Sequence, residues 1–293
     1  MPDENQPSLL LPIARRGERL DREIKLWQRL HNLSNQEAYK RIGVSKATYT
    51  NYTGTHPKPI RNGREKVFRA LGVASFEEAR RKYWELEDGK TEFFTSWIDE
   101  SENVFLSLLR NTTLVQETKL MMPIYPPAHM KYRAAFNRYC YERLVAGTLT
   151  VQKLEMVDNF DRLIDLAHNV LTFRPLNYQV RILKAPKQWY VSANFSVFDS
   201  GSVVSGASHK DHMPTNEMFF ASRDKRFVEY YGRFFQRLWN ADEAESLNPA
   251  HNVRDILTSY ARLIPGRENE TWASIEAAVK KRARAVRDYA TRY

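Results

Sequence analysis

The sequence predicts an α plus α/β protein: an all-helical N-terminal domain over residues 15–90, a layered α/β domain over residues 91–245 and a C-terminal helical extension over residues 246–293. Two observations support this fold class and its division into domains, and a third, on charge, concerns function. Apolar residues recur at helical spacing in the first 90 residues, whereas strand and helix patterns alternate beyond them. A length of 293 residues is sufficient for two ordinary domains. Positive charge is concentrated near the two ends of the chain.

The N-terminal domain begins after residues 1–14, which are polar, contain proline and are expected to form a flexible arm. Its helices are predicted from apolar residues at helical spacing. The first helix is indicated by Leu20, Ile24, Trp27 and Leu30, the fourth by Val67, Ala70 and Leu71 before Gly72, and a short fifth one by Phe76, Ala79 and Tyr83. Residues 87–90 are the expected linker.

Residues 33–54 form the segment on which the functional prediction depends. Two short helical patterns are joined by Ile42-Gly43-Val44. Ser34 and Ser45 each precede a pattern as an N-cap, and Glu37 completes a capping box with Ser34. A helix that ends at a glycine and is followed at once by a capped helix is typical of a helix-turn-helix.

This segment resembles the helix-turn-helix of the XRE, or lambda-repressor-like, family of transcriptional regulators. The matching residues are Leu33-Ser34, Glu37, Ile42-Gly43-Val44-Ser45, Thr48, Tyr52, Gly54 and Pro59. The sequence departs from the family at Tyr39, where alanine is usual, at Asn35, where glutamine is usual, and at Thr53, where glutamate is usual. The resemblance implies a cytoplasmic regulator, in our interpretation a repressor, that binds double-stranded DNA as a homodimer or higher homo-oligomer.

If the second of these helices enters the major groove, its exposed residues face base edges or nearby phosphates. The residues expected there are Ser45, Lys46, Ala47, Thr48 and Asn51. Lys46 can donate to guanine and Asn51 can pair with adenine, so these two are the predicted specificity residues. Residues expected at phosphates are Asn35, Thr53, Lys58, Arg61 and Arg64. The alternative is that some of these residues, Ser45 above all, only cap helices.

The charge distribution agrees with a phosphate-binding surface. Residues 15–73 contain 14 lysines and arginines against 5 acidic residues, and residues 280–293 contain 6 against 1. The long middle of the chain is close to neutral. Basic patches of this kind are typical of nucleic-acid contacts, although runs of charge are more often solvated helix faces.

Beyond the linker, the pattern predicts an α/β sandwich of strands and helices. Strands are expected at 119–125, 149–156, 178–183, 191–198, 202–205 and 218–221, and helices at 105–109, 134–145, 160–171 and 224–239. The last of these helices carries an apolar stripe that we expect to be buried in the core. Its members are Phe227, Tyr230, Tyr231, Phe234, Phe235 and Leu238.

The order of elements from residue 194 to residue 239 is similar to the second half of phospholipase-D-like domains. The strand Asn-Phe-Ser-Val-Phe-Asp at 194–199 corresponds to the strand that carries a nucleophilic histidine and a phosphate-binding lysine in active members. Asn194 and Ser196 occupy those places here. The resemblance therefore implies a catalytically degenerate domain for sensing or oligomerisation, and we expect no enzyme.

The segment 268–293 is predicted to be a helix with an apolar stripe and a basic C-terminal half, which docks on the protein or mediates dimerisation. No cofactor and no metal are expected. His209 and His212 lie in a Gly/Ser-rich loop without a third ligand, and Cys140 has no basic partner nearby. One cysteine suits a reducing cytoplasm, and no apolar run approaches the length of a membrane span.

The sequence thus predicts a DNA-binding regulator whose α/β domain dimerises and binds an unidentified small molecule or peptide effector. Two alternatives remain. One is a phosphodiesterase-type enzyme directed to DNA by its N-terminal domain. The other is a protein-interaction adaptor with a degenerate helix-turn-helix, which the excess of positive charge in residues 15–73 disfavours.

Overall fold

The computed structural model describes residues 18–94, 104–119, 134–173, 176–183, 193–207, 219–248 and 251–290. The chain divides into two compact units. The first, here the N-terminal unit, comprises Met1–Glu87 with Glu92–Phe94, and the second, the C-terminal unit, comprises Asp88–Thr91 with Thr95–Tyr293. None of the helices in the described ranges combines the length and the apolar character needed to cross a membrane.

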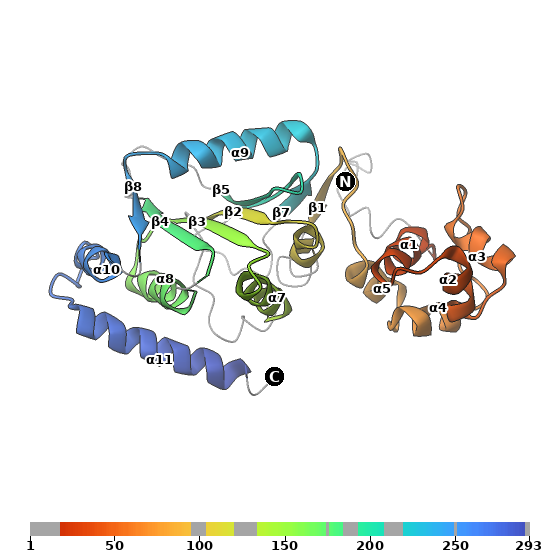
Figure 1. Cartoon of the computed structure of the whole chain (residues 1–293), viewed down its shortest axis with the longest axis horizontal. Coiled ribbons are helices and arrows are strands. Elements are labelled where there is room, and N and C mark those ends of the chain that lie inside the picture. The colour runs from red at the N-terminus through yellow and green to blue at the C-terminus, as the bar shows by residue number, and fades with distance from the viewer. Residues whose placement is uncertain are drawn as a thin grey trace, which may run out of the picture. The chain divides into compact units, whose positions relative to one another are not determined.

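Residues 18–82 of the N-terminal unit form short helices joined by loops (Figure 1). Its helices are α1 (Asp21–Leu30), α2 (Asn35–Ile42), α3 (Lys46–Thr53), α4 (Arg64–Leu71) and α5 (Phe76–Lys82). Leu20, Ile24 and Trp27 are buried in its core as predicted, whereas Leu30 is 45% exposed. The apolar stripe of α1 therefore ends at Trp27, one turn earlier than the sequence pattern indicates.

The start and end of α2 follow from local chemistry. The Ser34 side chain accepts a hydrogen bond from the backbone of Glu37, and the Glu37 carboxylate accepts one from the backbone of Ser34, so the predicted capping box is formed. Gly43 ends the helix with φ of 77°, a left-handed conformation that favours glycine. Ser45 then caps α3 by accepting a hydrogen bond from the backbone of Thr48.

Tyr39 fits into this unit without disrupting it. Ala38 is fully buried where α2 meets the core, and the neighbouring Tyr39 is half-buried and packs against the same cluster. The small residue that allows a close approach of backbones is thus Ala38, and the larger ring of Tyr39 is placed towards the edge of the core.

The C-terminal unit is built on a mixed sheet in which strands β2 to β8 follow the order β7-β6-β5-β2-β3-β4-β8. Strands β2, β3 and β4 are parallel, and β5, β6, β7 and β8 are added in antiparallel fashion. The strands are β1 (Thr91–Phe94), β2 (Leu114–Lys119), β3 (Thr150–Glu155), β4 (Tyr178–Leu183), β5 (Ala193–Phe198), β6 (Ser202–Ala207), β7 (Phe219–Ser222) and β8 (Ala244–Leu247).

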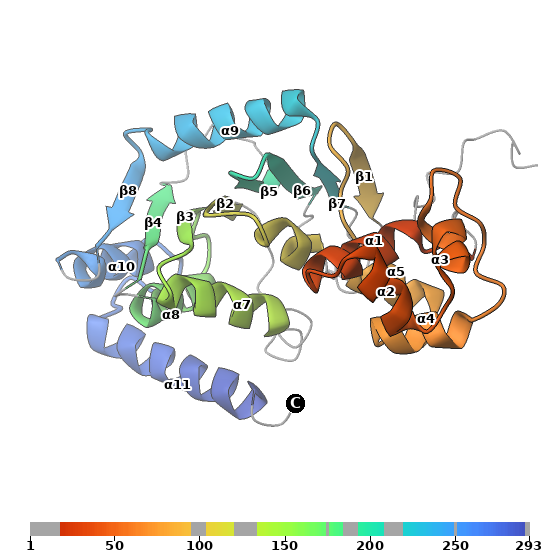
Figure 2. The same ribbon diagram turned by 45° about the vertical axis from the view of Figure 1, so that its right-hand side comes forward.

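Helices cover both faces of this sheet. Figures 1 and 2 show α9 (Lys225–Trp239) on one face, and α7 (Ala134–Val145), α8 (Phe160–Thr172), α10 (Val253–Arg262) and α11 (Trp272–Ala290) on the other. Phe235 and Leu238 of α9 are buried against Phe195 and Val203 of the sheet. The other face forms a second apolar cluster with α8, α10 and α11.

The terminal helix docks on the same unit, as one of the two sequence interpretations proposed. Ile275 and Val279 of α11 are buried in the cluster formed with α8 and α10. Arg282 adds an ion pair of 2.9 Å to Asp165 of α8. The apolar stripe of this helix is therefore covered within the chain.

The predicted fold class, α plus α/β, is confirmed, but several elements differ from the prediction. The strand expected at 119–125 is found at Leu114–Lys119, and residues 120–125 lie outside the described ranges. Polar residues at 116–119 obscured that strand. Strands β1 and β8 were not predicted, because short strands give a weak period-2 signal. Helix α10 was not predicted as a separate element either.

The prediction that the whole apolar stripe of α9 is buried was wrong at two positions. Phe227 is 42% exposed and Tyr230 is 65% exposed. The other members of the stripe are fully or half buried. Helix α9 carries more aromatic surface than one face of the sheet can cover, so two rings remain in contact with solvent.

Candidate nucleic-acid interface and the polar face of the sheet

Helix α3 presents one buried face and one exposed face. Tyr49 and Tyr52 are 4% and 5% exposed and anchor the helix in the core. Ala47 and Asn51, four residues apart on the opposite side, are exposed, and so is Lys46 in the first turn. Across the described residues, neither Lys46 nor Asn51 has a side-chain hydrogen bond or ion pair within the protein. These side chains are therefore available to an external partner.

Ser45 and Thr48 have a structural role at the start of α3. The Ser45 hydroxyl oxygen accepts a hydrogen bond of 3.1 Å from the backbone N–H of Thr48. The two hydroxyl oxygens lie 2.9 Å apart and share a second hydrogen bond. Ser45 therefore acts as a helix cap, as the alternative interpretation stated, and Thr48 is half-buried beside it.

The loop after α3 folds back onto the end of that helix. The backbone N–H of Lys58 donates a hydrogen bond of 2.8 Å to the carbonyl of Asn51, which brings these two predicted site residues together. Gly54 makes the sharp exit from α3, and a Cβ there would lie 2.7 Å from the carbonyl oxygen of Thr50. Only glycine permits this approach, so the position of Lys58 beside α3 depends on Gly54.

Gln28 of α1 fixes the start of α2 relative to α3. Its amide nitrogen donates hydrogen bonds of 2.9 Å to the carbonyl of Leu33 and to Oδ1 of Asn35. Its amide oxygen accepts a hydrogen bond from the Tyr49 hydroxyl. Because Oδ1 of Asn35 is the acceptor, its amide hydrogens remain free to donate elsewhere. No sequence pattern indicated this role of Gln28, which lies on the partly exposed side of α1.

The remaining predicted phosphate contacts are placed less uniformly. Thr53 is 8% exposed, and its hydroxyl donates a hydrogen bond of 2.9 Å to the carbonyl of Tyr49. Arg64 pairs with Glu18 at 2.6 Å. Arg61 is exposed in the loop before α4. The structure thus brings Asn35, Lys58 and the exposed residues of α3 towards solvent but buries Thr53.

The field around α3 is positive. The helix contains no acidic residue, and Lys40 and Arg41 lie in the last turn of the preceding helix. The positive N-terminal end of the α3 dipole adds to this field, and such a surface attracts phosphate.

A second polar cluster lies inside the C-terminal unit. Lys153 and Glu155 of β3 are 3% and 4% exposed and form an ion pair. Burial disfavours the ammonium of Lys153, but Glu155, Tyr178 and Glu117 together hold its pKa well above its ordinary value. For Tyr178, burial itself raises the pKa, because it disfavours the phenolate. Four interacting polar groups thus lie on one face of the sheet.

Asn194 and Ser196 lie on this same face, because Glu117 of β2 is paired with Lys153 on one side and with Ser196 on the other. Asn194 is two residues before Ser196 in β5 and therefore points the same way. The sequence Val-Gln-Lys-Leu-Glu of β3 resembles a half-exposed strand, so the burial of its charged pair could not be predicted. We call Glu117, Lys153, Glu155 and Tyr178 the buried cluster after its charged pair, and Glu117 and Tyr178 are themselves half-buried.

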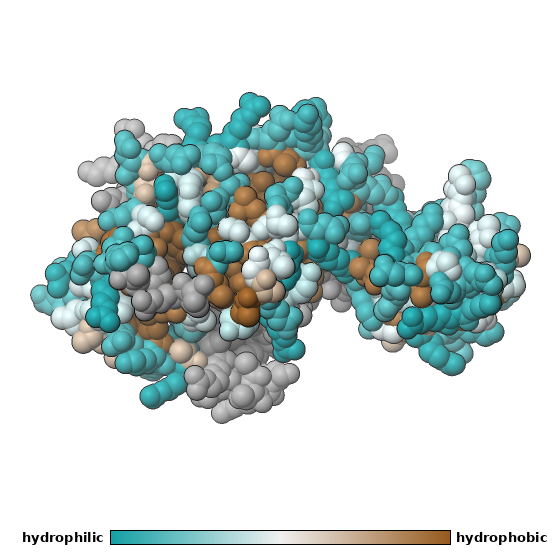
Figure 3. All heavy atoms as spheres, in the orientation of Figure 1, coloured by the Kyte–Doolittle hydropathy of each residue, from teal (hydrophilic) through white to brown (hydrophobic). Residues whose placement is uncertain are grey.

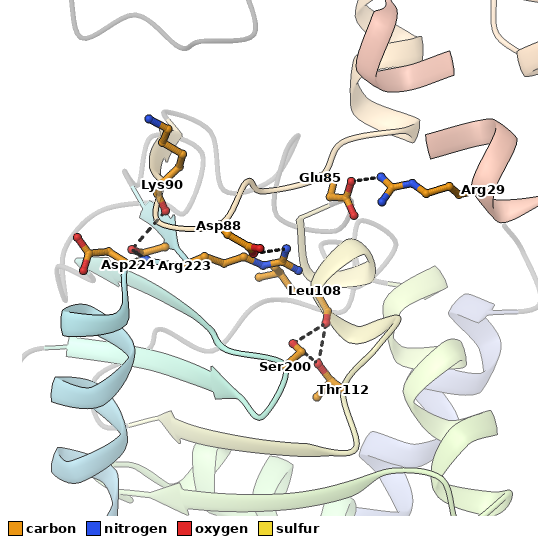
Figure 4. Close-up of polar contacts among 10 residues, drawn as sticks. Arg29, Glu85, Asp88, Lys90, Leu108, Thr112, Ser200, Arg223 and Asp224 are labelled. Atoms are coloured by element: carbon orange, nitrogen blue, oxygen red, sulfur yellow. Dashed lines mark hydrogen bonds and ion pairs between the residues drawn. The ribbon is translucent and has the colours of Figure 1, made fainter. Parts of the chain in front are cut away.

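Further polar contacts hold the loops of each unit. Figure 4 shows Arg223 of the C-terminal unit, whose guanidinium lies 3.2 Å from Asp88 and whose backbone N–H donates to the carbonyl of Lys90. It also shows Thr112 and Ser200, whose hydroxyl oxygens are 2.8 Å apart. Separately, Arg29 pairs with Glu85 in the N-terminal unit. These contacts fix loop positions and belong to neither candidate site.

Metal sites are not evident in the described ranges, where no group of three histidine, cysteine, aspartate or glutamate side chains is arranged to hold an ion. The pair His209 and His212 lies outside those ranges. Cys140 is half-buried in α7.

A capped helical module and a mixed sheet covered on both faces define the chain as an α plus α/β protein, and known structures share parts of this architecture. Nuc from Salmonella typhimurium, a phospholipase D family member, is 12% identical with a TM-score of 0.38, covering 54% of this chain and 98% of its own. TrmBL2, an archaeal chromatin protein described with a novel mode of DNA binding, is 13% identical with a TM-score of 0.39, covering 78% and 99%.

Phosphatidylserine synthase from Haemophilus influenzae is 8% identical with a TM-score of 0.40, covering 78% of this chain and 54% of its own. At such identities the likeness concerns the fold alone. No model of a protein family matches the chain, and no curated protein matches it. The similar structures include a phospholipase D family member, and the XRE resemblance is not confirmed by these comparisons.

These comparisons overturn the prediction that the chain is not an enzyme. The similar structures include a phosphatidylserine synthase and a member of the phospholipase D family. The prediction depended on Asn194 and Ser196, which replace the histidine and lysine of active phospholipase-D-like domains. That argument considered one strand, whereas the fold places further ionisable groups, Lys153 and Glu155, on the same sheet face.

Proposed function

We propose that this protein is a sequence-specific regulator that binds double-stranded DNA through α3. The observation that carries the proposal is the exposed, acid-free face of α3, on which Lys46, Ala47 and Asn51 have no partner among the described residues. A helix of this kind, held by two buried tyrosines and preceded by a tight glycine turn, is suited to the major groove.

Each exposed residue then has a role set by its chemistry. Lys46 donates to the acceptor atoms of guanine, and Asn51 forms a bidentate pair with adenine. Lys58 contacts phosphate beside the C-terminal end of α3, Arg61 does so from the following loop, and Asn35 does so at the start of α2. Thr53 is buried and takes no part.

A single helix-turn-helix contacts few base pairs, and we propose that the protein binds paired half-sites as a homodimer assembled through the C-terminal unit. Occupancy of such a site by a dimer would repress transcription from a neighbouring promoter. A small molecule or peptide that binds the C-terminal unit would change the spacing of the two α3 helices and so control DNA binding.

The experiment is a selection of genomic fragments by the full-length protein, followed by titration of the enriched duplex and of a scrambled duplex. Replacing Lys46 or Asn51 by alanine is expected to weaken binding to the enriched duplex by about 1–3 kcal/mol each and to leave binding to the scrambled duplex little changed. Lys25→Ala serves as the control, because it removes one exposed positive charge from α1. Arg61→Ala is expected to weaken both duplexes equally and to reduce the salt dependence.

Undiminished discrimination in both α3 variants would contradict this assignment. The same reactions, separated on a denaturing gel, also report strand cleavage. Cleavage that is retained in Lys46→Ala but lost in the double variant Lys153→Met with Glu155→Leu, at a temperature where that variant is folded, would support the alternative, a phosphodiesterase-type enzyme whose chemistry is located at the buried cluster.

A further inference from the structure

Helix α9 displays an exposed ridge that combines an aromatic ring with arginines. Tyr230 is 65% exposed, and the Arg233 side chain is 82% exposed. Arg237, also exposed, follows four residues later. Spacings of three and four residues place the three side chains on one face of the helix, over about 10 Å of its length. We call Tyr230, Arg233 and Arg237 the α9 ridge. In the orientation of Figures 1 and 3, α9 lies along the upper edge of the C-terminal unit.

The ring of Tyr230 is held in place by two neighbouring rings of the same helix. It stacks on Phe234 with ring centroids 6.3 Å apart and an angle of 17° between the ring planes. Tyr231 meets it edge-on, with centroids 5.3 Å apart. Phe234 and Tyr231 in turn pack on Phe195 of β5. The exposed ring is therefore the outermost layer of an aromatic stack that is rooted in the core, so little conformational freedom is lost when a ligand covers it.

The side chains on and around the ridge carry a net positive charge. Arg233 lies 3.5 Å from Glu229, which also approaches Lys225 at 3.6 Å. Both pairs are exposed, and such pairs contribute little and leave the guanidinium open to a stronger acceptor. Arg226, one turn before Tyr230, is held by the carboxylate of Asp224 at 2.7 Å. Arg237 has no such partner within the ranges that the structure describes.

We propose that the α9 ridge binds an unpaired nucleic-acid strand, with one base stacked on Tyr230 and adjacent phosphates on Arg233 and Arg237. An exposed aromatic ring flanked by guanidinium groups matches the alternation of base and phosphate along a single strand. A duplex hides its base faces and would leave the Tyr230 ring unused. A second copy of α9 would place arginines against arginines, which disfavours self-association through this ridge.

This inference goes beyond the proposed function, because it assigns a second nucleic-acid contact, of different specificity, to the C-terminal unit. A regulator with both contacts binds duplex DNA through α3 and captures a separated strand or a transcript through α9. The two contacts use different residues and can be inactivated independently.

The test is fluorescence anisotropy of the full-length protein with a labelled 20-nucleotide oligothymidylate and with a mixed-sequence duplex of equal length. Tyr230→Ala is expected to weaken binding of the oligothymidylate roughly tenfold. Tyr230→Phe retains the ring and is expected to bind like the unmodified protein. Arg233→Ala combined with Arg237→Ala is expected to weaken binding and lower its salt dependence. The control is Lys225→Ala, which removes an exposed charge on the same helix outside the ridge.

Equal affinity of Tyr230→Ala and the unmodified protein for the oligothymidylate would overturn the proposal. So would a parallel loss of single-strand and duplex binding, because that would indicate a general phosphate surface. The variants at Lys46 and Asn51 separate the two functions. If they lose duplex discrimination while oligothymidylate binding persists, both assignments stand. If oligothymidylate binding disappears with them, α3 and not α9 holds the strand.

Discussion

Tyr49 of α3 donates a hydrogen bond of 2.5 Å to the side-chain oxygen of Gln28 in α1. The same amide group donates from its nitrogen to Leu33 and Asn35, so one glutamine connects three helical elements of the N-terminal unit. The angle of α3 relative to α2 is fixed by this side chain as well as by the apolar core.

Replacing Gln28 by alanine removes three hydrogen bonds and leaves the half-buried Tyr49 hydroxyl without its acceptor. We expect a loss of about 1–3 kcal/mol in unfolding free energy. We also expect weaker binding of duplex DNA, although Gln28 is not itself a proposed contact. Urea unfolding and a DNA titration at a temperature where the variant is folded measure the two effects. Lys25→Ala, on the exposed side of the same helix, is the control, and equal effects of both changes would refute the positioning role.

The capping box of α2 predicts a dependence on pH. The pKa of Glu37 is lowered from its ordinary 4.5 by hydrogen bonds from Ser34. A carboxyl with a depressed pKa in the folded state adds stability above the ordinary value, and this stability is lost as the pH falls through the lowered value. Glu37→Gln should therefore flatten the decline of stability below pH 4.5. Thermal unfolding across acidic buffers tests this, and an undiminished decline in Glu37→Gln would contradict it.

The buried cluster predicts a large effect of removing one charge. Lys153→Met leaves the Glu155 carboxylate buried without its ammonium partner, which is expected to cost about 3–5 kcal/mol of unfolding free energy. Replacing Glu155 by leucine in the same protein removes the orphaned charge, and much of the loss should return. Denaturant titration of the single and double variants measures both. A single variant as stable as the unmodified protein would contradict this account of the buried pair.

The buried cluster also predicts how the stability of the protein depends on pH in alkaline solution. The pKa values of Lys153 and Tyr178 are both raised in the folded state, from ordinary values of 10.5 and 10.0. Groups of this kind stabilise the fold fully below their ordinary values, and the contribution is lost as the pH rises through the folded values. Stability should therefore fall above pH 10.5 more steeply in the parent than in the double variant. Unfolding midpoints in a series of alkaline buffers test this.

Gly232 offers a stabilising substitution in the middle of α9. A Cβ at this position would meet nothing within 4 Å, and its backbone is not left-handed. Alanine there should raise the unfolding free energy by roughly 0.5–1 kcal/mol, because glycine loses more backbone freedom on folding. The opposite sign is expected for Gly43→Ala, where φ is 77°. Urea unfolding of the two variants measures both changes, and destabilisation by Gly232→Ala would show a contact that this geometry excludes.

Local signals accounted for most of the helical unit. The serine caps, the glycine after α2 and the paired tyrosines of α3 act within a few residues of one another, so their consequences can be predicted from the order of the residues. The exposed candidates Lys46, Ala47 and Asn51 follow from that pattern by helical periodicity.

Sequence alone determined the fold class, the helix-turn-helix pattern, the uneven charge and most strands and helices of the α/β unit. Only the tertiary structure decided that Thr53 is buried, that Gln28 joins α1 to α2 and α3, that Lys153 and Glu155 are paired inside the sheet, and that Tyr230 is exposed. The physical reason is the distance along the chain over which the interactions act. Caps and periodicity depend on neighbours along the chain, whereas burial and pairing depend on which distant segments the sheet and its covering helices bring into contact.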